Sequence, residues 1–350
     1  MDGIDASLIY TDGVTIFDFI NNVSIEYPND LKIKIKEACA RFREGKVCWM
    51  DLNKLKKTLT LCNLEAVREV INKNTDSSAK VDIIGYHGQT VYHSPQNKVS
   101  VQLGDPKYLS KLSNIPVVFN FRMCDILNGG QGAPLTPIYH CERFRRVSSS
   151  PLAIVNIGGI SNITCLSDKD IIAFDSGPGN CMIDDAMYKY FSKNYDNRGQ
   201  LASDGNLNSE FLDILMRDEF FNIKPPKSLD RYYFHKYAEY VEMTPQDLVC
   251  TLSYFTANTI VQGLEYLPKN IDNIIICGGG SKNDFITNKI SELSKKHVII
   301  SDSIGINSGY IESEAFAYLA VRCFLNLNIS YPKTTGIEKA MSGGSIFWPK

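Results

Sequence analysis

Asp175 is the carboxylate in this sequence that is best placed to do chemistry. The stretch "IIAFDSGPGN" puts it at the end of an apolar strand pattern, with Gly177 and Gly179 around a proline directly after it. These small residues keep bulky side chains away, so the carboxylate is expected beside open backbone. Such a group can accept a proton from a nucleophile or hold a hydrated Mg²⁺. On spacing alone, capping of the following helix is an equally good interpretation.

Two glycine-rich stretches, "NIGGISN" and "CGGGSKN", also follow strand patterns, at places where backbone amides can approach a nucleotide's phosphates. Neither stretch is a Walker or dinucleotide-binding sequence, and each alone could be only a tight turn. Their recurrence strengthens the interpretation that backbone amides approach a ligand there.

Polar residues gather in two further motifs. "GYHGQTVYH" holds His87, Gln89 and Thr90 after an apolar run, where a histidine is more often structural and substrate contact is the second interpretation. In "FRMCDILNGGQGAP", Arg122 and Asp125 have the spacing of an ordinary helical ion pair. The glycine stretch beyond them is typical of a domain crossing or of the mobile lip of a cleft.

The composition predicts a cytoplasmic globular protein. A length of 350 residues favours two domains. With 37 basic and 39 acidic residues, the net charge of -2 gives no general attraction to nucleic acid or to anionic membranes. No apolar run reaches membrane-spanning length, and the N-terminal stretch has aspartates where a secretory signal has basic residues. The ten cysteines and five histidines are scattered, which argues against a disulfide framework and a zinc site.

Short β-branched runs alternate with helical patterns, and this alternation predicts an α/β fold. The spacing predicts helices over 244–267 and 313–327. A weak internal repeat is also present: 153–167 has the pattern strand, glycine turn, strand, and the stretch "MDGIDASLIY" is similar to that unit from its turn onward. We therefore expect the first strand of the N-terminal unit to be missing.

Ten stretches, in order along essentially the whole chain, resemble the anhydro-N-acetylmuramic acid kinases. They are "MDGIDASL", "GYHGQTVYH", "QLGDP", "FRMCD", "GGQGAPLTP", "VNIGGISN", "FDSGPGN", "PPKS", "CGGGSKN" and "PKTTGIEKAMSGGSI". Each stretch alone is weak evidence, but ten in register are highly specific.

The resemblance implies the fold shared by acetate and sugar kinases, Hsp70 and actin. We expect two actin-like ATPase (RNase H-like) domains, each with a mixed five-stranded sheet flanked by helices, closing on ATP in an interdomain cleft. The first domain is expected at 1–121 plus about 335–350, and the second at 122–334.

The resemblance also implies a phosphotransferase with an alcohol group as acceptor. Such enzymes use ATP, Mg²⁺ and water to open 1,6-anhydro-N-acetylmuramic acid and phosphorylate O6 in peptidoglycan recycling. Asp175 matches the general base, and Mg²⁺ is expected to be held mainly by ATP phosphates and water. The family's form further suggests a homodimer. The sugar side would comprise Arg122, Glu312, His87, Gln89 and Thr90, and the nucleotide side Asp2, Gly3, Asp5, Gly158, Gly159, Asn162, Gly278, Gly279 and Asn283.

Two positions depart from the family pattern. Asn120 stands where the family usually has aspartate, and Asp2 and Gly3 follow only half of the expected N-terminal phosphate loop. Either the start codon is assigned too late or the chain is a decayed copy. The alternative functions are therefore an inactive nucleotide-binding or sugar-binding relic, and another sugar kinase or phosphatase of the same superfold.

Overall fold

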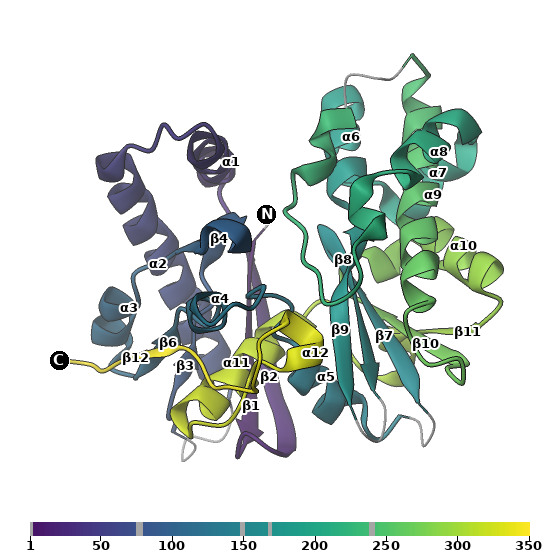
Figure 1. The fold of residues 1–350 in the computed structure, drawn as a ribbon. Helices are drawn as coiled ribbons and strands as arrows, with labels where there is room; N and C mark the ends of the chain where they lie inside the picture. The colour runs from purple at the N-terminus through teal and green to yellow at the C-terminus, as the bar shows by residue number, and fades with distance from the viewer. Residues whose placement is uncertain (1–2, 75–79, 148–150, 167–169, 238–241) are drawn as a thin grey trace. The chain divides into compact units, whose positions relative to one another are not determined.

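The computed structural model describes residues 3–74, 80–147, 151–166, 170–237 and 242–350, and it divides into two compact units (Figure 1). Unit 1 comprises Met1–Arg143, Glu312–Pro332 and Gly336–Lys350, and unit 2 comprises Phe144–Ile311 and Lys333–Thr335. The chain is thus an α/β protein of two units, as the sequence predicts.

The unit boundaries differ from the predicted ones, which lay at 121/122 and about 334/335. Residues 122–143 and 312–332 belong to unit 1. The reason is apolar packing: Leu135, Phe316 and Leu319 are buried in one cluster with Val118 and Phe121. These contacts join segments that are remote in sequence.

Unit 2 is built on the expected mixed five-stranded sheet, in the order β11-β10-β7-β8-β9. β7 pairs in parallel with β10, and β10 with β11, whereas β8 pairs antiparallel with β7 and β9. The strands are β7 (Leu152–Ile157), β8 (Ile160–Leu166), β9 (Ile171–Pro178), β10 (Asn273–Cys277) and β11 (His297–Ile300).

The helices of unit 2 bury this sheet. The longest of them, α9, packs against β8 and β9, and its Phe255 and Ile260 lie in one core with Ile163 and Phe174. It begins where the sequence predicts, because the Thr244 hydroxyl accepts a hydrogen bond from the Asp247 amide (3.1 Å). The helices are α6 (Cys181–Phe191), α7 (Gln200–Asp204), α8 (Ser209–Met216), α9 (Pro245–Leu264) and α10 (Asp284–Ser294).

Unit 1 has three smaller sheets in place of the single five-stranded sheet expected for the first domain. They are β1-β2, β12-β6-β3 and β4-β5. If β1 and β2 correspond to β8 and β9, as the internal repeat predicts, no described strand of unit 1 takes the central position that β7 has in unit 2. Strands must lie about 4.8 Å apart to share hydrogen bonds, so the β1-β2 hairpin stays separate from β3 without that strand. The strands are β1 (Gly3–Thr11), β2 (Ile16–Glu26), β3 (Ile84–Gly85), β4 (Gln89–Ser94), β5 (Val99–Leu103), β6 (Val117–Phe119) and β12 (Ser345–Phe347).

The helices of unit 1 include the two that carry the chain across the unit boundaries. These are α5, which ends just past Arg143, and α11, whose second residue is Glu312. The 313–327 helix prediction is met by α11. The remaining short helix, α12 (Pro332–Thr335), lies mostly in unit 2. The helices of unit 1 are α1 (Asn29–Arg43), α2 (Trp49–Asn72), α3 (Pro106–Ser113), α4 (Met123–Leu127), α5 (Pro137–Phe144) and α11 (Ile311–Phe324).

Candidate active site

A row of polar residues crosses three neighbouring strands of the unit 2 sheet. Asp175 in β9 is paired in register with Asn162 in β8, and Asn162 with Asn156 in β7. Residues paired directly across strands lie on the same face. Asp175 is only 6% exposed, so the row places a carboxylate and two amides within the sheet.

Asp175 is held by the segment that follows two consecutive prolines. Its backbone N–H donates to the Lys227 carbonyl (3.0 Å), and its Oδ2 accepts from the Leu229 amide (2.8 Å). The first contact fixes the main chain at Asp175, and the second orients its carboxylate.

Lys227 is a buried cation beside this carboxylate. It is 5% exposed, its Nζ donates to the Phe220 carbonyl (3.0 Å), and Nζ lies 4.3 Å from the centre of the Phe220 ring. Burial lowers the pKa of Lys227 to about 8, and the charge of Asp175 opposes that shift.

Asn162 carries an unsatisfied atom next to Asp175. Its buried Oδ1 has no hydrogen-bond partner within the described residues. A buried acceptor left without a donor costs about 1–3 kcal/mol. A water molecule or ligand donor at this position would recover that energy.

The two glycine turns follow adjacent parallel strands, since Cys277 at the end of β10 is in register with Asn156 near the end of β7. A side chain at Gly158 or Gly159 would meet no other atom closer than 3.5 Å, and Gly279 faces open space. Gly278 has a φ of +78°, and Asn156 Oδ1 leaves no room for a Cβ there. The turns therefore expose backbone at one end of the sheet, as phosphate binding requires.

Asn283 has a structural role that its motif did not reveal. It is 6% exposed and is the N-cap of α10, where its Oδ1 accepts from the Ile286 amide (3.1 Å). Its role toward a nucleotide stays a prediction.

In unit 1, Arg122 and His87 contact each other. Arg122 donates to His87 Nε2 from Nε (3.2 Å) and Nη2 (3.0 Å), and to the Gly132 carbonyl from Nη1 (2.8 Å). The Asp125 carboxylate accepts from the Gly132 amide (2.6 Å). Burial and the charge of Arg122 hold the pKa of His87 well below its usual range, so its ring is neutral. The neutral ring accepts from the arginine through Nε2 and so orients it.

Glu312 is close enough to Arg122 and Asp5 for their charges to act on it. Its side chain is accessible to solvent, yet desolvation by the surrounding protein raises its pKa; Arg122 opposes this shift and Asp5 adds to it. Three predicted site residues of unit 1 thus share one electrostatic environment.

The other predicted residues of unit 1 belong to its hairpins. Gln89 donates to the Thr90 carbonyl (3.3 Å), and Thr90 Oγ1 accepts from Gln102 (3.4 Å). Gly3 starts β1 and is paired with Glu26 of β2. The Ile25 carbonyl leaves no room for a Cβ at Gly3. Asp2 lies outside the described residues.

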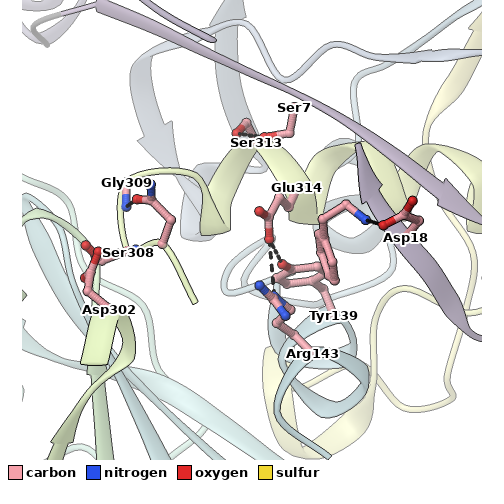
Figure 2. A network of polar contacts seen from close by, with 11 residues as sticks. Ser7, Asp18, Tyr139, Arg143, Asp302, Ser308, Gly309, Ser313 and Glu314 are labelled. Atoms are coloured by element: carbon pink, nitrogen blue, oxygen red, sulfur yellow. Dashed lines mark hydrogen bonds and ion pairs between the residues drawn. The ribbon is translucent and has the colours of Figure 1, made fainter. Parts of the chain in front are cut away.

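Polar contacts fix the first turn of α11, the turn that carries Glu312. Figure 2 shows the Glu314 side chain of α11 facing Tyr139 and Arg143 of α5: its Oε2 accepts from the Tyr139 hydroxyl and lies 3.4 Å from Arg143 Nε. In the same turn the hydroxyl groups of Ser313 and Ser7 are hydrogen-bonded (2.6 Å). These contacts hold the start of α11 against α5 and β1.

The donor groups fit a magnesium ion that arrives with a nucleotide. Among the described residues, no group of three or more His, Cys, Asp or Glu side chains could hold a metal ion. Magnesium held mainly by phosphates and water needs only one or two protein oxygens, and Asn162 Oδ1 is such an oxygen. Within the described ranges, no helix is long and apolar enough to span a membrane.

Comparison with known proteins decides the family. The family model described as anhydro-N-acetylmuramic acid kinase matches residues 1–349. The chain belongs to the anhydro-N-acetylmuramic acid kinase family. It is an enzyme, a phosphotransferase with an alcohol group as acceptor.

Relatives named anhydro-N-acetylmuramic acid kinase are similar to this chain over nearly their whole length. The protein of that name from Zymomonas mobilis is 37% identical over 355 residues, covering 99% of this chain and 97% of the relative. The Rhodopseudomonas palustris protein (strain ATCC BAA-98 / CGA009) is 36% identical over 360 residues, covering 100% and 96%. Among solved structures, a ROK family glucokinase from Streptomyces griseus in complex with glucose and AMPPNP has a TM-score of 0.42 at 11% identity, covering 91% of this chain and 96% of that one. That likeness is too low to be evidence for a shared ligand.

The sequence analysis named no site residue in the segment 227–231, although this segment begins within "PPKS", a stretch that carries part of the resemblance to the kinase family. Leu229 donates a hydrogen bond to the Asp175 carboxylate, and the charge of Lys227 acts on the same group. Arg231 lies beside the glycine turn at Gly159. The available signal was a lysine and an arginine four residues apart in a stretch otherwise poor in helix or strand pattern.

Proposed function

We propose that this enzyme opens 1,6-anhydro-N-acetylmuramic acid with water and phosphorylates O6, giving N-acetylmuramic acid 6-phosphate and ADP in peptidoglycan recycling. The observation that supports this best is the buried Asp175 carboxylate, oriented by two backbone contacts beside the unpaired Asn162 Oδ1. We further propose that the enzyme is cytoplasmic and that its partners are the sugar and ATP.

In the proposed reaction Asp175 acts as the general base. It accepts a proton from water as the water oxygen forms a bond to C1 of the sugar. The C1–O6 bond breaks and O6 keeps the electron pair. O6 then attacks the γ-phosphorus of ATP, the bond to the bridging oxygen breaks, and ADP leaves with that electron pair. The proton on Asp175 passes to solvent.

The nucleotide would be held by the backbone at the two glycine turns. Gly158, Gly159 and Gly279 have room for a ligand beside their backbone, and the amides of the two turns, with that of Gly278, would bind phosphate oxygens. Mg²⁺ bound with ATP would neutralise charge that develops on the phosphates. Asp5 and Gly3 of β1 remain predicted nucleotide contacts.

The sugar would be bound by unit 1. Arg122, oriented by His87 and the Gly132 carbonyl, presents a cation suited to the lactyl carboxylate of a muramic acid. Glu312 can accept hydrogen bonds from sugar hydroxyl groups, and Gln89 and Thr90 complete the predicted polar set. Transfer to O6 requires that the bound sugar and the γ-phosphate meet during turnover.

The test is to incubate the purified chain with MgATP and 1,6-anhydro-N-acetylmuramic acid and to quantify ADP and sugar 6-phosphate. The proposal predicts equal amounts of the two products. As a control, N-acetylmuramic acid with an already open ring replaces the substrate and should yield little phosphate ester. No sugar phosphate from the anhydro sugar, or equal rates with the two sugars, would contradict the proposal.

A further inference from the structure

Arg231 lies against the glycine turn between β7 and β8. Its Nη1 is 3.9 Å from the position that a Cβ would occupy at Gly159. Its carbonyl accepts from the Cys181 thiol (3.5 Å) at the start of α6. The guanidinium is therefore beside a turn whose outer side is open.

The hydrogen-bonding capacity of Arg231 is only partly used. A guanidinium has five N–H donors. It forms an ion pair with Asp185 at the long distance of 3.6 Å from Nη2, and its buried Nε has no hydrogen-bond partner within the described part of the chain. About a quarter of the side chain is exposed, so an anion can reach it.

Asp185 would keep a partner if Arg231 turned toward a ligand. Its other carboxylate oxygen lies 3.0 Å from His235 Nε2. Exchanging the 3.6 Å ion pair for a bidentate contact with a phosphoryl group is favourable. The two parallel N–H groups of a guanidinium match two phosphate oxygens, and such charged hydrogen bonds are among the strongest in proteins.

We propose that Arg231 is the side-chain ligand of the phosphoryl group that is transferred, acting together with the Gly158–Gly159 turn. This proposal rests on the proposed kinase function. In the reaction, negative charge is spread over the equatorial oxygens of the γ-phosphoryl group, and a guanidinium beside them stabilises the transition state more than the ground state.

Lys227, the other cation of the same segment, does not fit this role. Its Nζ is bound to the Phe220 carbonyl and lies among the rings of Phe220 and Tyr266. The charge of Lys227 acts on Asp175. Arg231, in contrast, lies beside the glycine turn between β7 and β8.

The test compares Arg231→Met, Arg231→Lys and a matched control, Arg217→Met, whose arginine is an exposed residue of the same unit. For each variant we would measure kcat, the KM for ATP and for the sugar, and the affinities for MgADP and Mg-AMPPNP without sugar. Arg231→Met should lower kcat about 100-fold or more and weaken AMPPNP about 10-fold, with ADP affinity within about threefold of wild type. Arg231→Lys should recover part of the loss, and Arg217→Met should match wild type.

A kcat of Arg231→Met within about threefold of wild type, or equal losses of ADP and AMPPNP affinity, would overturn the proposal. If the methionine variant fails to fold, the lysine variant decides in its place, because it keeps the charge but lacks the fork. If the wild type binds both nucleotides but does not phosphorylate the sugar, the proposed function fails, and the difference between ADP and AMPPNP affinity still tests Arg231.

Discussion

At the scale of single residues, the site in unit 2 depends on one buried carboxylate and one buried ammonium group. Asp175 raises the pKa of Lys227, against the larger effect of burial. The two opposite charges attract each other. Lys227 therefore helps to hold the carboxylate that is the proposed general base.

The free energy of unfolding should depend on pH through the titration of Lys227. Its pKa is about 8 in the folded chain and about 10.4 when unfolded. Between these values the unfolded state binds more protons, so this group makes the free energy of unfolding rise with pH from about 8 to 10.4. Lys227→Met should remove that rise. The measurement is urea unfolding of both proteins at pH 7.5 and 10. A rise of the same size in both would show that Lys227 is not the group responsible.

The position of Asp175 at a strand end before a glycine turn is a local feature of the sequence, but that position favoured a base and a helix cap equally. Its role as general base comes from the resemblance to the kinase family and stays a prediction. Lys227 and Arg231 could not be found from local features. Leu229 contacts Asp175 across 54 positions of the chain, and no local pattern ties the two segments together. His87 was predicted either as structural or as a substrate contact, and the structure shows it in contact with Arg122.

At the scale of elements, helix starts and glycine turns set the geometry of the site. Asn283 caps α10 directly after the short 3₁₀ turn Gly279–Lys282. The position of this turn relative to the sheet therefore depends on the cap as well as on β10.

The cap gives a second prediction. Asn283→Ala should lower the free energy of unfolding by about 1 kcal/mol, while Asn283→Asp should leave it nearly unchanged, because aspartate caps as well as asparagine. The control is Asn288→Ala, an exposed position within α10 where alanine favours the helix. Denaturant titration measures all three. Equal stability of the Ala and Asp variants would contradict the capping role.

Long periodic helices such as α9 were predictable because hydrophobic spacing and an N-cap agree there. The separate sheets of unit 1 were not predictable. Strand pairing depends on which strands are neighbours in space, and a hairpin such as β1-β2 has the same local pattern with or without a third strand beside it.

At the scale of the whole molecule, the predicted nucleotide and sugar residues divide largely between the two units. Gly158, Gly159, Gly278 and Gly279 belong to unit 2, whereas Arg122 and its partners belong to unit 1. The unit boundaries escaped prediction because apolar contacts made by α11 and by Leu135 place residues 122–143 and 312–332 in unit 1. Such contacts leave no local signal in the sequence.

This division predicts separate footprints in hydrogen exchange. MgADP alone should slow amide exchange at 156–162 and 277–283, and the sugar alone should slow it at 84–90 and 119–132, because bound ligands protect the amides they contact. Mass spectrometry of peptides from both units would measure this. Protection of only unit 1 by MgADP would contradict the assignment of the glycine turns.

The most direct test of the central claim is the turnover of Asp175→Asn with MgATP and 1,6-anhydro-N-acetylmuramic acid, compared with wild type. Asparagine keeps the size of the side chain and can still accept from the Leu229 amide, but it is a far weaker base. We predict a loss of kcat of about 100-fold or more, with MgADP affinity and thermal stability close to those of wild type. Turnover within about threefold of wild type would remove Asp175 from the mechanism and contradict the proposed reaction.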